Sequence, residues 1–137
     1  MTDKKVKVLI IEDDRDILRT TSFRLEKNGF ETVTAENGRD GLNQVRRSRP
    51  DIILLDLLIP GINGYDVARN VKRDNSLRYI PLVIISARAE AREAVRKDLG
   101  AEGFVLKPFE PGELLAAVND LTARRRESRK EDTDSRG

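Results

Sequence analysis

The fold of this chain is decided by the stretch Val8-Leu9-Ile10-Ile11-Glu12-Asp13-Asp14. Four aliphatic residues in a row are followed at once by three carboxylates. An apolar run of this length between polar residues is typical of a strand that is buried on both faces of a parallel sheet. We therefore predict a strand over residues 6–11, with the carboxylates at its carboxyl end.

Two further apolar runs end in charged residues. Asp56 follows Ile52-Ile53-Leu54-Leu55, and Lys107 follows Phe104-Val105-Leu106 and precedes Pro108. Ligands of an open parallel sheet bind beyond the carboxyl ends of its strands. Charged side chains that are far apart in the sequence are therefore expected to meet at one edge of one sheet.

The whole chain alternates between strand and helix patterns. Strands are predicted at residues 6–11, 32–35, 51–55, 82–85 and 103–106. Helices are predicted from 14 or 15 to 28, between 38 and 49, at 65–73, at 90–99 and from 111 onward. Such alternation indicates an α/β fold in which helices cover both faces of a doubly wound parallel sheet. We expect five strands in the flavodoxin-like order 2-1-3-4-5, which makes the first and third strands neighbours.

Length and composition exclude several kinds of chemistry. The 137 residues fit one domain with a sizeable core, expected at residues 1–122, followed by a charged tail or linker at 123–137. The absence of cysteine excludes disulfides, thiolate metal sites and thiol catalysis. The absence of histidine excludes Ser-His catalysis, histidine-ligated zinc and phosphohistidine chemistry on this chain.

Charge and hydropathy limit the expected partners. Residues 123–137 hold six basic and four acidic side chains, so residues 1–122 balance at 20 of each sign. A domain without net basic character is a poor candidate for nucleic-acid binding. No apolar run is long enough to span a membrane, and the first five residues leave no room for a signal peptide before the first strand. A cytoplasmic protein is expected.

Crowded carboxylates at one sheet edge require a counter-charge. Glu12 and Asp13 after the first strand and Asp56 after the third could not all ionise at neutral pH without one. A hard divalent cation with oxygen ligands resolves the repulsion, and Mg²⁺ is the expected cofactor. Lys107 adds a positive charge that can pair with a carboxylate or a phosphate.

At these residues the chain resembles the receiver domains of two-component response regulators. The similarity covers about residues 5–122. It is carried by four segments in order: Val8-Leu9-Ile10-Ile11-Glu12-Asp13-Asp14, Leu54-Leu55-Asp56-Leu57-Leu58-Ile59-Pro60-Gly61-Ile62-Asn63-Gly64, Val83-Ile84-Ile85-Ser86-Ala87 and Gly103-Phe104-Val105-Leu106-Lys107-Pro108-Phe109. Each segment alone is modestly specific, whereas accidental agreement of all four in order is improbable.

The resemblance implies a role for each matched residue. Asp56 would be the phosphoacceptor, Ser86 and Lys107 would contact phosphoryl oxygens, and Phe104 would change rotamer on activation. Asp13 would bind Mg²⁺ directly and Glu12 largely through water. The residues implied for the metal site are Glu12, Asp13, Asp56 and the backbone carbonyl of Leu58. The Lys107-Pro108 peptide bond would be cis, which proline permits.

The expected function is that of a phosphorylation-controlled binding module, with no turnover of an external substrate. A histidine kinase or a histidine phosphotransfer protein would donate the phosphoryl group. An output protein or domain would bind the surface made by residues 90–99, 103–106 and the helix from 111. A phosphorylation-dependent homodimer is a further expectation. Both a stand-alone regulator and a receiver from a longer protein fit a chain of this length.

Two other functions compete with this interpretation. Asp14-Arg15-Asp16 offers a D-x-D motif at the end of the first strand, where phosphatases resembling the haloacid dehalogenase family keep their nucleophile. A helix-capping role for Asp14 is the simpler interpretation. Flavin binding is disfavoured because the first strand-to-helix turn is acidic, whereas an anionic phosphate requires amides or hydroxyls.

Two positions depart from the commonest receiver pattern. Leu58, two residues after Asp56, is apolar, and Arg88, two residues after Ser86, is basic. In receivers these positions flank the phosphoryl group and help to set its lifetime. Because Leu58 could hinder an attacking water, we predict slow self-dephosphorylation.

Overall fold

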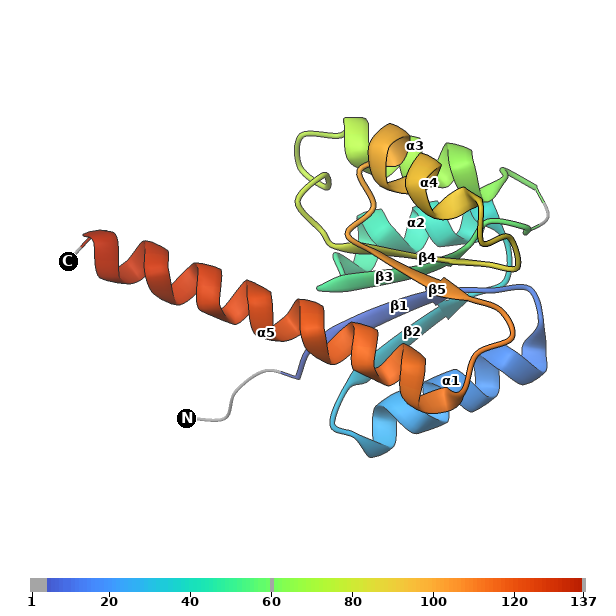
Figure 1. The fold of residues 1–137 in the computed structure, drawn as a ribbon, viewed down its shortest axis with the longest axis horizontal. Coiled ribbons are helices and arrows are strands. Elements are labelled where there is room, and N and C mark those ends of the chain that lie inside the picture. The colour runs from blue at the N-terminus through green and yellow to red at the C-terminus, as the bar shows by residue number, and fades with distance from the viewer. Residues whose placement is uncertain (1–4, 60, 137) are drawn as a thin grey trace.

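A computed structural model describes residues 5–59 and 61–136, with side chains described up to Arg124. It contains five parallel strands in the order β2-β1-β3-β4-β5, as predicted (Figure 1). The strands are β1 (Lys7–Ile11), β2 (Glu31–Ala35), β3 (Ile52–Asp56), β4 (Leu82–Ser86) and β5 (Gly103–Leu106). The helices are α1 (Arg15–Lys27), α2 (Gly38–Ser48), α3 (Gly64–Arg73), α4 (Ala91–Leu99) and α5 (Pro111–Arg136).

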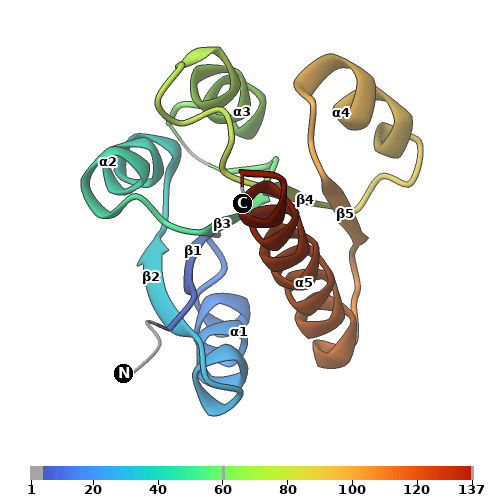
Figure 2. The ribbon, with the colours of Figure 1, turned by 90° about the vertical axis from the view of Figure 1, so that its left-hand side faces the viewer.

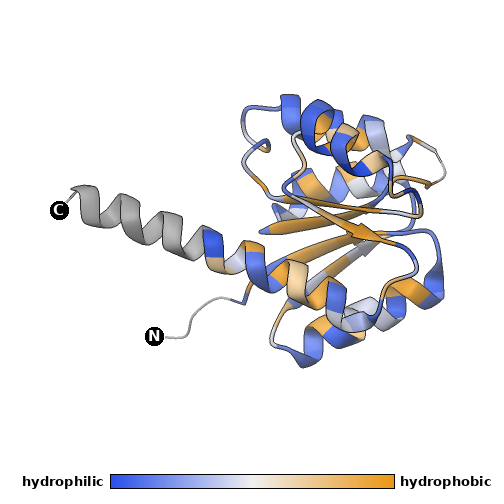
Figure 3. Ribbon diagram, viewed as in Figure 1, coloured by the Kyte–Doolittle hydropathy of each residue, from blue (hydrophilic) through white to orange (hydrophobic). Residues whose placement is uncertain are grey.

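Helices cover both faces of the sheet. Figure 2 shows α1 and α5 on one side and α2, α3 and α4 on the other. Because successive strand residues point to opposite faces, β1 contributes Leu9 and Ile11 to the core under α2–α4, and Val8 and Ile10 to the core under α1 and α5. The strands are accordingly the most hydrophobic part of the molecule (Figure 3). This double burial explains why the central strands β1, β3 and β4 appear in the sequence as apolar runs.

Local capping groups set most helix ends. The side chain of Asp14 accepts hydrogen bonds from the first turn of α1, and Asn37 and Asn63 cap α2 and α3 in the same way. Gly29 follows α1 and Gly100 ends α4, with φ angles of 91° and 67°. Those left-handed conformations favour glycine. Each helix therefore starts or stops at residues visible in the sequence.

Two strands extend one residue further than predicted. Asp56 is the last residue of β3 and pairs with Ile85, and Ser86 is the last residue of β4 and pairs with Leu106. The sequence pattern ends each strand at its last apolar residue, whereas backbone pairing continues to the first polar one. Asp56 and Ser86 are thereby held by the sheet itself.

The last helix, α5, runs past the predicted domain end at residue 122 to Arg136. Arginine, glutamate and lysine dominate this extension, and these residues favour helix. The tail's side chains beyond Arg124 lie outside the described residues, and its role as a linker stays a prediction. Within the described part of the chain, no helix combines the length and apolar character needed to cross a membrane.

Candidate functional site

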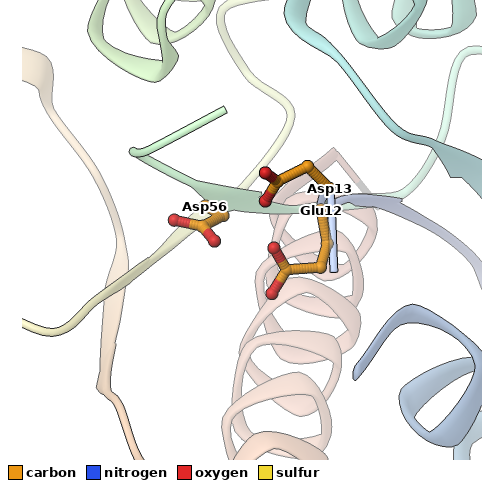
Figure 4. Close-up of side chains that lie close together, drawn as sticks. All are labelled: Glu12, Asp13 and Asp56. Atoms are coloured by element: carbon orange, nitrogen blue, oxygen red, sulfur yellow. The ribbon is translucent and has the colours of Figure 1, made fainter. Parts of the chain in front are cut away.

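The predicted acidic cluster forms at the carboxyl edge of the sheet. Glu12 and Asp13 directly follow β1, Asp56 ends β3, and these strands are neighbours. One carboxylate oxygen from each of the three residues lies within 4.8 Å of the other two. Figure 4 shows the three side chains gathered at one place. Glu12 and Asp56 are buried, whereas Asp13 is exposed to solvent.

Lys107 reaches this cluster from the end of β5. Its Nζ donates hydrogen bonds to Oδ2 of Asp56 at 2.6 Å and to Oε1 of Glu12 at 2.9 Å. These are charge-assisted pairs at nearly buried carboxylates, so they are stronger than ion pairs on an open surface. The sequence predicted that Lys107 would meet the acids, but not that one ammonium would bridge two of them.

The electrostatics of the cluster leave Glu12 easily protonated. Burial, together with the neighbouring Asp56, raises the pKa of Glu12 to about 7, against the opposing effect of Lys107. Burial acts to lower the pKa of Lys107, but its hydrogen bonds to Asp56 and Glu12 outweigh that effect and raise the pKa above its usual range. Lys107 is therefore charged at neutral pH, and it does not fully neutralise the acids around it.

The second oxygen of Asp56 is held by the connection that follows β3. The backbone N–H of Leu58 donates to Oδ1 of Asp56 at 2.9 Å. Both carboxylate oxygens of Asp56 thus have a donor, one from Leu58 and one from Lys107. The Leu58 side chain itself is 73% exposed beside the site.

Ser86 lies at the adjacent strand end and is buried. Its Oγ accepts a hydrogen bond from the backbone N–H of Arg88 at 3.1 Å, and its carbonyl accepts from the backbone N–H of Lys107 at 2.8 Å. The sheet therefore ties Ser86 to Lys107 through the backbone. The predicted cis bond between Lys107 and Pro108 is present.

Phe104 lies on β5 and pairs in register with Ile84, two residues before Ser86. Side chains two apart on a strand share a face, so Phe104 and Ser86 belong to the same face of the sheet. The Phe104 ring is half-buried, and the guanidinium of Arg92 on α4 lies 4.9 Å from its centroid. Arg92 could not be predicted from the sequence, because nothing in a lone exposed arginine indicates which ring it covers.

The D-x-D motif does not form a second acidic site. Oδ1 of Asp14 accepts hydrogen bonds from the backbone N–H groups of Asp16 and Ile17 at 3.0 and 3.2 Å, so Asp14 is the cap of α1. Asp16 is an exposed residue of the first helical turn. The phosphatase alternative is therefore not supported.

Comparison with known proteins identifies the family of the chain. The family model described as "Response regulator receiver domain" matches residues 8–119. The chain belongs to the response regulator receiver domain family. This receiver domain is 38% identical over 119 residues to the phosphate regulon transcriptional regulatory protein PhoB of Escherichia coli, covering 86% of the chain and 52% of PhoB. It is 35% identical to the DNA-binding response regulator MtrA of Mycolicibacterium smegmatis, covering 86% of the chain and 51% of MtrA.

Solved structures show the same receiver fold. A putative response regulator from Chloroflexus aurantiacus superposes with a TM-score of 0.81 at 29% identity, covering 88% of this chain and 99% of that one. The chemotaxis response regulator CheY4 of Vibrio cholerae gives a TM-score of 0.81 at 27% identity, covering 86% of this chain and 99% of that one. The chain spans about half the length of PhoB and MtrA, and nearly all of the two solved chains.

Proposed function

We propose that this receiver domain accepts a phosphoryl group on Asp56 from a phosphohistidine of a histidine kinase or phosphotransfer protein, and that the modification changes its affinity for an output partner. The observation that carries the proposal is the grouping of Asp56 with two further acids and a bridging lysine at the ligand edge of the sheet. The identity of the donor and of the output partner, the cytoplasmic location and a phosphorylation-dependent homodimer stay predictions.

The acids fit a hard divalent cation, and Mg²⁺ is the proposed one. Glu12, Asp13 and Asp56 offer three carboxylate oxygens within 4.8 Å, and oxygen is the donor that Mg²⁺ prefers. Three carboxylates face one ammonium, so the metal-free cluster with all its acids ionised holds more negative charge than Lys107 neutralises. Glu12, Asp13, Asp56 and the Leu58 carbonyl are the residues that would hold the ion. When bound, it would neutralise charge on the phosphoryl oxygens.

Asp56 acts as the nucleophile in the proposed reaction. A carboxylate oxygen of Asp56 forms a bond to phosphorus while the bond from phosphorus to the donor imidazole nitrogen breaks, and the nitrogen keeps the electron pair. Lys107 already lies 2.6 Å from an oxygen of Asp56, so it can follow the charge onto the incoming phosphoryl group. Positioning and electrostatics of this kind supply most of the catalysis in phosphoryl transfer.

The Ser86 hydroxyl is the group that senses the new phosphate. A phosphoryl group adds about two negative charges and three acceptor oxygens. Among the described residues, Ser86 Oγ accepts a hydrogen bond from the Arg88 backbone N–H, so its own proton can be donated to one of these oxygens. Its movement would open space on the face that it shares with Phe104, and so alter the surface formed by α4, β5 and α5.

We propose that the protein that donates the phosphoryl group binds beside α1 through one of its helices. A largely apolar cavity of about 480 Å³ lies between α1 and α5, and Ile17, Phe109 and Leu115 are among its lining residues. Lys107 and Ala87, from the two loops at the phosphorylation site, line the same cavity. An amphipathic helix that places its apolar face there would bring a polar residue to the site.

Intact-mass spectrometry tests the proposed function. The protein is incubated with acetyl phosphate and Mg²⁺, and we expect a mass increase of one phosphoryl group that disappears in Asp56→Asn. Asp14→Asn serves as the matched acidic control and is expected to remain phosphorylatable. Phosphorylation that survives Asp56→Asn, or that requires Asp14 instead, would overturn the proposal.

A further inference from the structure

The start of α2 lies against the connection that carries the proposed metal ligand Leu58. Gly38 is the first residue of α2, and Asn37 caps it by accepting a hydrogen bond from the Asp40 backbone N–H at 2.8 Å. Gly38 faces the backbone of Ile62, in the connection between β3 and α3. The capped N-terminus of α2 thus lies directly against the backbone of another segment.

The closeness of this approach depends on the missing side chain of Gly38. A Cβ at this position would overlap the carbonyl oxygen of Ile62 and lie 2.7 Å from its carbonyl carbon. Both are backbone atoms, which cannot move aside without moving the connection itself. Gly38 is not one of the residues with positive φ, so close approach and not backbone conformation requires glycine here.

The far end of the same connection is also fixed. Gly64 donates its backbone N–H to the Leu57 carbonyl at 3.2 Å, and a Cβ on Gly64 would lie 2.5 Å from the Leu57 Cα. Leu58, which lies between Leu57 and Ile62 in the sequence, donates its backbone N–H to Asp56. The half-buried Ile62 side chain packs against the core under α2–α4. Ile62 and Leu58 thus belong to one short connection whose end at Gly64 is held against Leu57.

We infer that Gly38 is a positioning residue for phosphorylation: its contact with Ile62 holds the connection after β3 so that Leu58 presents its N–H to Asp56 and its carbonyl to the metal. Gly38 touches none of the reacting groups, and it acts through Ile62 and Leu58. The inference rests on the proposed function only for the identity of the ion, because the Leu58–Asp56 hydrogen bond exists without it.

The test is Gly38→Ala, with two readouts. In the metal-free protein we expect the Leu58 amide resonance to shift in the ¹H–¹⁵N correlation spectrum, because its hydrogen bond to Asp56 is disturbed. Titration calorimetry should show Mg²⁺ binding weakened by about 10- to 100-fold, the usual effect of losing a group that orients a metal ligand.

Gly41→Ala is the matched control on the same helix. Its Cβ would also crowd a neighbour, but that neighbour is a side chain and not a backbone: atoms of Ile11 lie 2.7 to 3.0 Å away. We expect Gly41→Ala to lower thermal stability while leaving the Leu58 amide resonance in place. A shift of that resonance in Gly41→Ala equal to the one in Gly38→Ala would overturn the inference, because general disturbance of α2 would then explain both.

Ile62→Ala provides a second route if Gly38→Ala does not fold. It removes the side chain that anchors the connection without adding a clash, and the same shift and weaker Mg²⁺ binding are expected. Unchanged Leu58 resonance and unchanged Mg²⁺ affinity in the folded variants would sink the inference. If the wild-type protein binds no Mg²⁺ and accepts no phosphoryl group, the proposed function fails, and the Leu58 resonance still decides the role of Gly38.

Discussion

At the scale of single residues, we expect the protonation of Glu12 to control cation binding by the acidic cluster. Its pKa is raised to about 7, so its proton competes with a metal near neutral pH. A raised carboxyl pKa favours the protonated form, which means that metal affinity falls as pH falls through that value. Between about pH 8 and about pH 6 the ionised fraction of Glu12 drops by roughly tenfold. We predict that Mg²⁺ affinity, measured by calorimetry, weakens by the same factor.

The matched variant is Glu12→Gln, which keeps the shape of the side chain and removes its titration. Its Mg²⁺ affinity should be weaker at high pH and should vary much less over the same interval. An equally steep pH profile in Glu12→Gln would assign the titration to another group.

Leu58 offers a second prediction at the residue scale. Its side chain is 73% exposed next to Asp56 and cannot hydrogen-bond a water molecule. We expect the phosphorylated protein to lose its phosphoryl group slowly, and Leu58→Asn to lose it severalfold faster because an amide can orient the attacking water. The decay is followed by intact mass after removal of acetyl phosphate. A wild-type half-life of seconds, or no acceleration in Leu58→Asn, would contradict this.

At the scale of helices and strands, much of the architecture could be predicted because the three central strands, β1, β3 and β4, are buried on both faces. Runs such as Ile52-Ile53-Leu54-Leu55 have no polar position to confuse the pattern, and they end at the carboxyl edge of the sheet. The sequence pattern puts Asp56 and Ser86 one residue outside their strands, because the apolar runs end one residue before the backbone pairing does. The caps at Asp14 and Gly100 are local and therefore legible in the sequence.

Contacts between distant elements could not be predicted. The contact of Gly38 with the Ile62 backbone joins two segments whose spacing depends on the packed fold, and glycine at a helix start has many other causes. The same holds for Lys72, whose Nζ bonds Glu102 at 2.5 Å while Glu102 accepts from the Leu82 backbone at 2.6 Å. Such pairs depend on side-chain reach across the fold, for which a single sequence carries no periodic pattern.

The contact between α4 and β5 leads to a prediction at this scale. Arg92 over the Phe104 ring is a cation–π pair, a kind of contact worth about 0.5–1 kcal/mol at exposed sites. If Phe104 leaves this position on activation, Arg92→Ala should shift the equilibrium toward the activated form by about two- to fivefold. The measurement is the affinity for beryllofluoride, a phosphoryl analogue.

Two variants define the specificity of that effect. Arg96→Ala removes a neighbouring arginine of α4 that pairs with Glu93 instead of the ring, and it should leave the affinity unchanged. In a Phe104→Leu background, Arg92→Ala should have no further effect. If Arg92→Ala still raised the affinity for beryllofluoride in the Phe104→Leu background, Arg92 would act by its charge alone.

At the scale of the whole molecule, the acidic cluster is expected to limit the stability of the metal-free protein. Glu12 and Asp56 are carboxylates buried at the carboxyl edge of the sheet, and Lys107 is the one cation bonded to them among the described residues. A cation that binds the folded state but not the unfolded chain stabilises the fold by about 2.7 kcal/mol at 100 times its dissociation constant. For a domain of this size that free energy corresponds to a predicted rise in Tm of about 9 °C with Mg²⁺ at that concentration.

Circular dichroism melting curves in Mg²⁺ and in EDTA test this prediction. The exposed Asp13 is the matched position, because Asp13→Asn removes a proposed ligand without opening the core. Most of the Mg²⁺-dependent rise should vanish in this variant. Equal melting temperatures of the wild-type protein in Mg²⁺ and EDTA would contradict a metal site in this cluster.

The length of α5 has a mechanical consequence. The helix starts four residues after Lys107 and continues for 26 residues, well beyond the sheet (Figure 1). At 1.5 Å per residue, its axis is about 39 Å long, so a tilt of about 5° at its start would displace its other end by about 3 Å. A tilt of α5 too small to disrupt the packing of Leu114 would therefore move its far end by about the size of a side chain.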